Sequence, residues 1–387
     1  MAEILKTARW AVAAMFAANG FLMGIWATQI PLLLPRHSIT ETTLGLLILA
    51  LGLGAVGAML FAGRLIVAYG SCQVMIAFAL CAPVSLMLVV FAPNLWVLAP
   101  TMAAFGALIG CMDVAMNANA VVVERGLGRA IMSSSHGFWS LGGFIGGSAG
   151  SFAIVRLGAE GQIIGAVLLT LGVVAVAAPF LLRDTPAPRS DKVQARGVLL
   201  PRDASLWILG ALALFSMIPE GAVLDWSGIY LSKELGSDLF RSGLGFAACA
   251  GAMAIMRFAG DGVRNRLGAV KTLRISGLIG AAGLMLAAVA PVDWVVIAGF
   301  AITGLGVANM VPILFSAAGN HPGIDSGAAI STVTMVGYAG ILVAPSSIGF
   351  IGEHFGFSLT YAAVSVLLLV VSGLAGRAVA ADGVRGT

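Results

Sequence analysis

Long apolar runs fill most of the chain, and polar positions gather in short segments between them. A helix needs about 20 mostly apolar residues to cross the hydrocarbon core of a bilayer. Runs of this kind predict helices near residues 10–34, 42–69, 72–92, 95–123, 130–157, 160–182, 204–232, 241–262, 270–290, 293–318, 325–350 and 356–379. The pattern therefore predicts an all-α membrane protein with 12 transmembrane helices.

One long polar segment divides these helices six and six. It predicts an N-terminal six-helix bundle over 1–182, a cytoplasmic linker over 183–203 and a C-terminal six-helix bundle over 204–387. The halves echo each other, because residues 62–74 (AGRLIVAYGSCQV) and 256–273 (MRFAGDGVRNRLGAVKTL) each carry an Arg and then a Gly between two helices. Two related, pseudo-symmetric bundles predict a solute site between them near the middle of the membrane.

Composition and charge agree with this pattern. Hydrophobic residues make up 59% of the chain and charged residues only 10%, whereas a soluble domain carries roughly 25% charged residues. If the N-terminus is cytoplasmic, 17 of the 21 Lys and Arg residues fall on the predicted cytoplasmic side, as the positive-inside rule requires. We therefore expect both termini in the cytoplasm and the first helix to remain in the mature protein.

The sequence lacks the signatures of an enzyme or an ATP-driven pump. His37, His136, His321 and His354 are far apart, and neither an HExxH nor a GxxxxGK[ST] motif is present. We expect no catalytic residues, no metal and no cofactor, and a driving force that comes from an ion gradient. An intramembrane enzyme and a non-transporting receptor are minor alternatives.

Three carboxylates, Asp113, Glu220 and Asp225, fall inside the apolar runs. A charged side chain at the centre of a membrane helix costs at least about 2.5–3.5 kcal/mol, so such residues usually face a polar cavity. Asn117 lies four residues after Asp113 on the same helix face, and a tight turn between the fourth and fifth helices places Asn117 opposite His136. We interpret Asp113, Glu220 and His136 as proton-coupling residues. Asp113 could instead stay ionised and bind an amine, or be structural.

Pro219 predicts a kink in the seventh helix immediately before Glu220. Asp225 is five residues further on, about 140° around the helix. We therefore do not expect Glu220 and Asp225 to face one cavity, and Asp225 with Trp226 is expected at an outer gate.

Amide and aromatic side chains supply the remaining candidates for solute binding, because amides both donate and accept hydrogen bonds. The full predicted set is Asn19, Trp26, Gln29, Asp113, Asn117, His136, Trp139, Glu220, Asp225, Trp226, Asn309 and Tyr338. No basic residue is expected at the depth of these acids. The set therefore favours a neutral polyol or a protonated amine over an anion.

Four sequence segments resemble those of a known transporter family: MDVAMNANAVVVER, IMSSSHGFWSLGG, EGAVLDWSGIYL and GLGVANMVPILFSAAG. With the 6+6 helices and the repeated junctions, the chain resembles the major facilitator superfamily, and within it the bacterial YbjJ/MosC-like branch. The superfamily's cytoplasmic loop motif would correspond to Arg64, Gly70, Arg257, Asp261, Arg264, Arg266 and Gly268.

The resemblance implies a secondary active transporter in the bacterial inner membrane that works by alternating access. It also implies a small polar solute, such as a polyol, an inositol or an amino-inositol of the rhizopine kind, and coupling to protons. We expect a monomer in a lipid bilayer that binds no nucleic acid. The alternative is a proton-driven multidrug or metabolite exporter, which the 16 Met and 19 Phe leave open.

Overall fold

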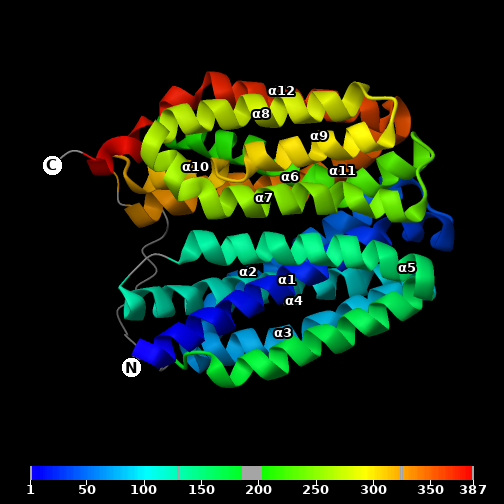
Figure 1. Cartoon of the computed structure of the whole chain (residues 1–387), viewed down its shortest axis with the longest axis horizontal. Coiled ribbons are helices and arrows are strands. Elements are labelled where there is room, and N and C mark those ends of the chain that lie inside the picture. Colours follow the sequence, from blue (N-terminus) through cyan, green and yellow to red (C-terminus); the bar gives the residue numbers. More distant parts are fainter. Residues whose placement is uncertain (1, 129–130, 185–202, 323, 325, 386–387) are drawn as a thin grey trace.

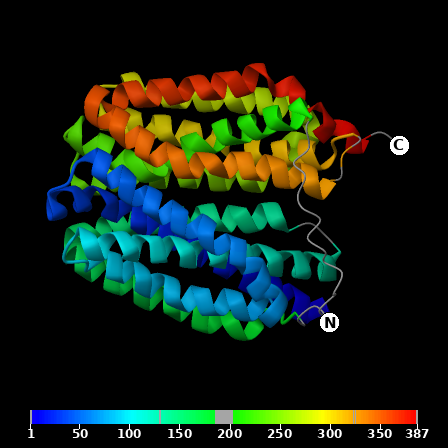
Figure 2. The same ribbon diagram turned by 180° about the vertical axis from the view of Figure 1, so that it is seen from behind.

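The computed structural model describes residues 2–128, 131–184, 203–322, 324 and 326–385, and these residues form helices without a strand. Figures 1 and 2 show two groups of long helices side by side, with both chain termini at one end of the molecule. We call this the termini end. The far end is formed by the connections 38–40, 91–94, 234–238, 290–292 and 356.

The first group comprises α1 (Ala2–His37), α2 (Glu41–Tyr69), α3 (Ser71–Val90), α4 (Leu95–Leu127) and α5 (Met132–Ala177), followed by the short helix η1 (Ala178–Phe180). The second group comprises α6 (Ala204–Lys233), α7 (Leu239–Leu267), α8 (Ala269–Val289), α9 (Asp293–Val307), α10 (Met310–Gly319), α11 (Ser326–Phe355), α12 (Phe357–Gly373) and η2 (Ala375–Arg385).

Ten helices in the described part of the chain are long and apolar enough to cross a membrane, or eleven if Phe357–Gly373 and Ala375–Asp382 form one bent span. The count falls short of twelve at α5, where the expected helices 130–157 and 160–182 form one element. Gly158 breaks this element with φ of 74°, and Figure 1 shows α5 reversing its direction at the far end. A straight helix of 46 residues would measure about 69 Å, more than twice the roughly 30 Å hydrocarbon core. The break therefore gives α5 two arms of membrane-spanning length.

The two groups repeat one turn at the termini end. Gly70 (φ 85°) joins α2 to α3, and Gly268 (φ 82°) joins α7 to α8, both in a backbone region that favours glycine. Asp184 accepts hydrogen bonds from the backbone N–H groups of Ser71 and Cys72 at 2.8 and 3.1 Å. The first N–H groups of a helix lack partners within the helix, so Asp184 closes the start of α3.

Asp382 does the same for α8, accepting from the N–H groups of Ala269 and Val270 at 2.6 and 3.4 Å. In each group, a carboxylate near the C-terminal end of the group thus caps the first turn of the third helix, which is α3 in the first group and α8 in the second.

Glycines bring α1 and the first arm of α5 into backbone contact. A Cβ on Gly142 would lie 2.0 Å from the carbonyl oxygen of Ala17, and one on Gly20 would lie 1.9 Å from that of Trp139. Small residues permit such close approach in membranes. This contact places polar side chains of α1 and α5 next to each other.

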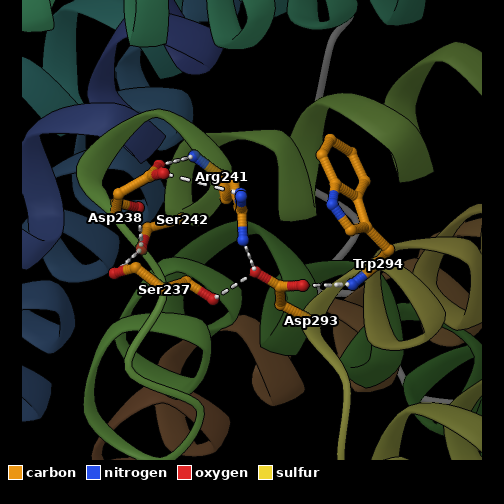
Figure 3. Close-up of polar contacts among 6 residues, drawn as sticks. All are labelled: Ser237, Asp238, Arg241, Ser242, Asp293 and Trp294. Carbon is orange, nitrogen blue, oxygen red and sulfur yellow. Dashed lines mark hydrogen bonds and ion pairs between the residues drawn. The ribbon is translucent and has the colours of Figure 1, made fainter.

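At the far end, a polar cluster joins α7 to α9 (Figure 3). Arg241 forms an ion pair with Asp293 at 2.9 Å and a longer one with Asp238 at 3.5 Å. Ser237 donates to Asp293 at 3.3 Å, and the Arg241 guanidinium lies 5.6 Å from the Trp294 ring centroid. The cluster lies within the second group and fixes neighbouring helices there.

Candidate functional site

A cavity of about 330 Å³ lies between the two helix groups, lined by α1, α2, α4 and α5 from the first and by α6, α7 and α11 from the second. Its walls are mostly apolar. The polar and aromatic lining side chains are Asn19, Trp26, Asp113, His136, Trp139, Glu220, Asp225, Trp226 and Arg257. The cavity thus brings together eight of the candidates named from the sequence, which come from four helices.

On the α4–α5 wall, Asn117 joins Asp113 to His136. The Asn117 Nδ2 donates to the Asp113 carbonyl oxygen at 2.9 Å, and its Oδ1 lies 3.2 Å from His136 Nε2. Asn117 does not line the cavity itself. It contacts the backbone of Asp113 and the ring of His136, two residues that do, and the position expected for Asn117 opposite His136 is confirmed.

On the α1–α5 wall, the Trp139 indole N–H donates to Asn19 Oδ1 at 2.8 Å. Both residues lie where α1 and α5 touch, so the glycine contact described above places them. Together they present an aromatic ring and an amide to the cavity.

Arg257 on α7 faces the cavity, where no basic residue was expected. Its guanidinium forms an ion pair with Glu220 on α6 at 3.5 Å and donates to Ser140 Oγ on α5 at 2.5 Å. Leu267, the last residue of α7, comes ten positions later, about 15 Å along the helix. Arg257 therefore lies about three helical turns from the cytoplasmic loop, although it was predicted to belong to the loop motif.

Glu220 and Asp225 line the same cavity, contrary to the expectation from their angular separation. The lining of α6 runs from Met217 to Trp226 and includes side chains over a wide arc of the helix, so 140° of separation does not exclude a shared space. Asp225 is 8% exposed and interacts with the Trp26 side chain from the opposite group.

Two further predicted residues lie outside the cavity lining. Gln29 donates to the Ala159 carbonyl oxygen at 3.1 Å and to Gln162 Oε1 at 2.5 Å, so it fixes α1 to the second arm of α5. Asn309 lies at the break between α9 and α10 and donates to the Met256 carbonyl oxygen at 3.2 Å. Both are buried and satisfy neighbouring backbone. The side chain of Tyr338 is outside the described residues.

The loop-motif candidates have different environments. Gly70 and Gly268 occupy the two turns. Arg264 joins the end of α7 to Ser316 Oγ at 2.8 Å and to the Ala381 carbonyl oxygen at 2.9 Å. Arg64 lies over the Phe61 ring at 5.6 Å, and Arg266 is exposed. The side chain of Asp261 lies outside the described residues.

Sequence reasoning missed Ser140 and the place of Arg257. The signal for Arg257 was present, because it falls inside the apolar run 241–262. Within the described ranges, no three His, Cys, Asp or Glu side chains come together as a metal site. The arrangement offers hydrogen bonding, aromatic contact and an excess of carboxylates.

Comparisons with known proteins agree with this architecture. The sequence profile of the Major Facilitator Superfamily matches residues 11–323. An uncharacterized MFS-type transporter of Yersinia pestis is 36% identical over 365 residues, which cover 93% of each chain. The membrane protein MosC of Rhizobium meliloti is 34% identical over 369 residues, which cover 94% of this chain and 88% of MosC.

Solved structures show the same fold at low identity. A mutant of the nucleoside transporter NupG has a TM-score of 0.76 at 12% identity and covers 96% of this chain and 99% of its own. The human organic anion transporter MFSD10 has a TM-score of 0.69 at 14% identity, with coverage of 96% and 99%. The helices identify a multi-pass membrane protein, and the full-length relatives identify a transporter. The chain belongs to the major facilitator superfamily.

Proposed function

We propose that the protein moves a small polar solute, such as a polyol, an inositol or an amino-inositol of the rhizopine kind, by alternating access coupled to protons. The observation that carries this proposal is the cavity between the helix groups, in which three carboxylates meet one guanidinium. The excess of acid favours a neutral or cationic solute over an anion, because an anion would face uncompensated like charge.

The size and lining of the cavity support a small hydroxylated solute. Ligand cavities span about 300–1,000 Å³, so about 330 Å³ is room for one small molecule. Trp139 is partly exposed in this lining and Trp26 and Trp226 are buried behind it, while Asp113 and Glu220 offer polar contacts. A polyol ring presents one apolar face and several hydroxyls, which matches this combination.

Asp113 is the proposed proton carrier. It forms no ion pair with any described residue, and Asn117, which contacts both its carbonyl oxygen and His136, carries no charge. Carboxyl groups inside membrane helices commonly serve as proton relays, because they can bind and release a proton when their surroundings change. It can therefore take up a proton from one side and release it when water reaches it from the other.

Contacts at the far end support alternating access. Lys233 at the end of α6 forms an ion pair with Glu41 on α2, and the Thr42 backbone N–H donates to Glu353 Oε2 on α11 at 2.8 Å. A Cβ on Gly45 of α2 would lie 2.9 Å from Ser346 Cα on α11. The two helix groups are thus joined at the far end. With the termini assigned to the cytoplasm, we take this as the state closed to the outside.

A multidrug or metabolite exporter is the second candidate, and one observation favours it. Met23, Met59 and Met217 line the cavity, and flexible methionine side chains suit varied apolar ligands.

Tracer uptake into proteoliposomes separates the two candidates. We expect radiolabelled myo-inositol or an amino-inositol to accumulate when an inward proton gradient is imposed, and Asp113→Asn to lose that accumulation. Asp238→Asn, an equal change at the exposed far-end surface, should keep it. Efflux of an aromatic cation such as ethidium, without uptake of any inositol, would support the exporter and contradict the polyol proposal.

A further inference from the structure

Arg257 contacts both helix groups at the cavity. Its guanidinium donates to Ser140 Oγ on α5 at 2.5 Å and pairs with Glu220 on α6 at 3.5 Å. Its own carbonyl oxygen accepts from Ser133 Oγ on α5 at 3.0 Å. The guanidinium also lies 5.9 Å from the Trp139 ring centroid. One side chain on α7 therefore joins α6 of its own group to α5 of the other.

The contacts of this guanidinium to Ser140 and to Glu220 are unequal. Charge-assisted N–H···O⁻ bonds are usually about 2.7–2.9 Å long, so a separation of 3.5 Å leaves the Glu220 carboxylate incompletely paired. The side chain of Glu220 is 27% exposed and that of Arg257 is 14% exposed, and both line the cavity. A donor group in the cavity can therefore reach Glu220 and compete with Arg257.

We propose that Arg257 is a positioning residue that links solute occupancy to the contact between the two helix groups. A solute hydroxyl or ammonium that binds Glu220 takes this carboxylate from Arg257. The guanidinium then keeps only neutral partners, Ser140 Oγ on α5 and the Ala308 carbonyl oxygen at 3.5 Å. A buried cation that loses its counterion is destabilised, so the contact between α5 and α7 weakens and the population moves toward the other state.

This inference rests on the proposed transport of a polar solute, but the state of the Arg257 contact can be measured without one. Glu220→Gln removes the charge of the carboxylate at nearly constant shape, so it should imitate the displaced state. Arg257→Gln removes the cation, and Ser140→Ala removes the hydrogen bond to α5. Arg257→Lys keeps the charge but lacks the planar fork that reaches two partners at once.

Distances between spin labels at Leu60 on α2 and Met335 on α11 report the separation of the groups at the termini end. Both side chains are exposed, at 74% and 47%. Cys81, the exposed one of the four cysteines, is replaced by Ser. Arg241→Gln is the matched control, because Arg241 joins α7 to α9 within one group (Figure 3).

Without solute, we expect Glu220→Gln, Arg257→Gln, Arg257→Lys and Ser140→Ala each to change the ratio of the two distance populations about tenfold, with the control unchanged. Glu220→Gln should add nothing further to Arg257→Gln, because Arg257→Gln has already removed the ion pair between these two side chains. Size-exclusion profiles and melting temperatures verify that each variant folds.

Two results would overturn the inference: unchanged populations in folded Glu220→Gln and Arg257→Gln, or additive effects in the double variant. Myo-inositol is then added to the unaltered protein. A shift in the same direction supports the whole account. A shift in the variants but none with myo-inositol supports the role of Arg257 and contradicts only the proposed solute.

Discussion

At the scale of single residues, the cavity separates acids that have different partners. Glu220 faces Arg257, Asp225 interacts with Trp26, and Asp113 lies beside Asn117. Only the first has a cation beside it among the described residues. Because their surroundings differ, we propose different roles for these carboxylates. Glu220 takes part in the contact between the helix groups, and Asp113 carries the proton.

Asp113→Asn should therefore separate solute binding from coupling. The amide cannot exchange a proton, so gradient-driven accumulation should fall at least about tenfold. Exchange of internal for external solute needs no net proton movement and should continue. Both are measured with the same tracer in proteoliposomes. Loss of exchange together with accumulation would assign Asp113 to solute binding, and full accumulation would remove it from the mechanism.

Sequence alone predicts the functional residues whose side chains are costly to bury in a membrane. Asp113, Glu220 and Asp225 stand out because charges are rare in apolar helices, and all three line the cavity. Gln29 and Asn309 look equally polar in the sequence, yet they bond to neighbouring backbone. Which way an amide points depends on helix rotation and packing, and the sequence pattern does not encode either closely enough.

At the scale of helices, Asp184 ties the start of α3 to the end of the first group. Burial works to raise the pKa of Asp184, but the hydrogen bonds from Ser71 and Cys72 outweigh it and leave the pKa below its usual range. A carboxylate with a lowered folded-state pKa stabilises the protein above the unfolded-state pKa of about 3.9, and this contribution is lost as pH falls through the folded-state pKa.

Asp184→Asn leaves one accepting oxygen where the carboxylate offers two, so it should lower the free energy of unfolding by about 1 kcal/mol near neutral pH. The difference from the unaltered protein should stay constant down to about pH 5 and vanish below the folded-state pKa. Thermal unfolding in detergent across this range measures it. Equal stability at pH 7 would show that the cap contributes nothing.

The contact between α1 and α5 gives a second test at this scale. Gly142→Ala places a Cβ 2.0 Å from a backbone oxygen of α1, so the helices must separate, and we expect a loss of about 1–3 kcal/mol. Gly165→Ala, where a Cβ meets nothing within 4 Å, should be neutral or stabilise by up to about 1 kcal/mol. Similar melting temperatures for the two variants would contradict the proposed close packing.

Helix positions were largely predictable, because apolar length is a strong signal for membrane spans. The observed bounds of α2, α4 and α6 lie within a few residues of the predicted ones. The break of α5 at Gly158 falls between the predicted helices 130–157 and 160–182. The break between α9 and α10 at Asn309 was not predicted, because it depends on local backbone angles, to which hydrophobicity is insensitive.

At the scale of the whole molecule, the far-end links between the helix groups should hold one conformation. Lys233→Gln removes the partner of Glu41. Because the Lys233 side chain is half exposed, the pair should contribute no more than about 1 kcal/mol, or about fivefold in population. A cysteine at Ile48 in the cavity should then react up to about fivefold faster with an impermeant thiol reagent added on the far side. Lys6→Gln is the control, and equal rates in the two variants would show that the pair does not hold the far end closed.

The central claim is that a cavity shared by two helix groups carries a polar solute together with protons. Its most direct test is the internal pH of proteoliposomes, followed with a trapped dye while polyols, inositols and amino-inositols are added outside one at a time. The account predicts that at least one of them acidifies the interior with the unaltered protein and that none does with Asp113→Asn. Uptake of such a solute without any change in internal pH, or acidification that persists in Asp113→Asn, would contradict it.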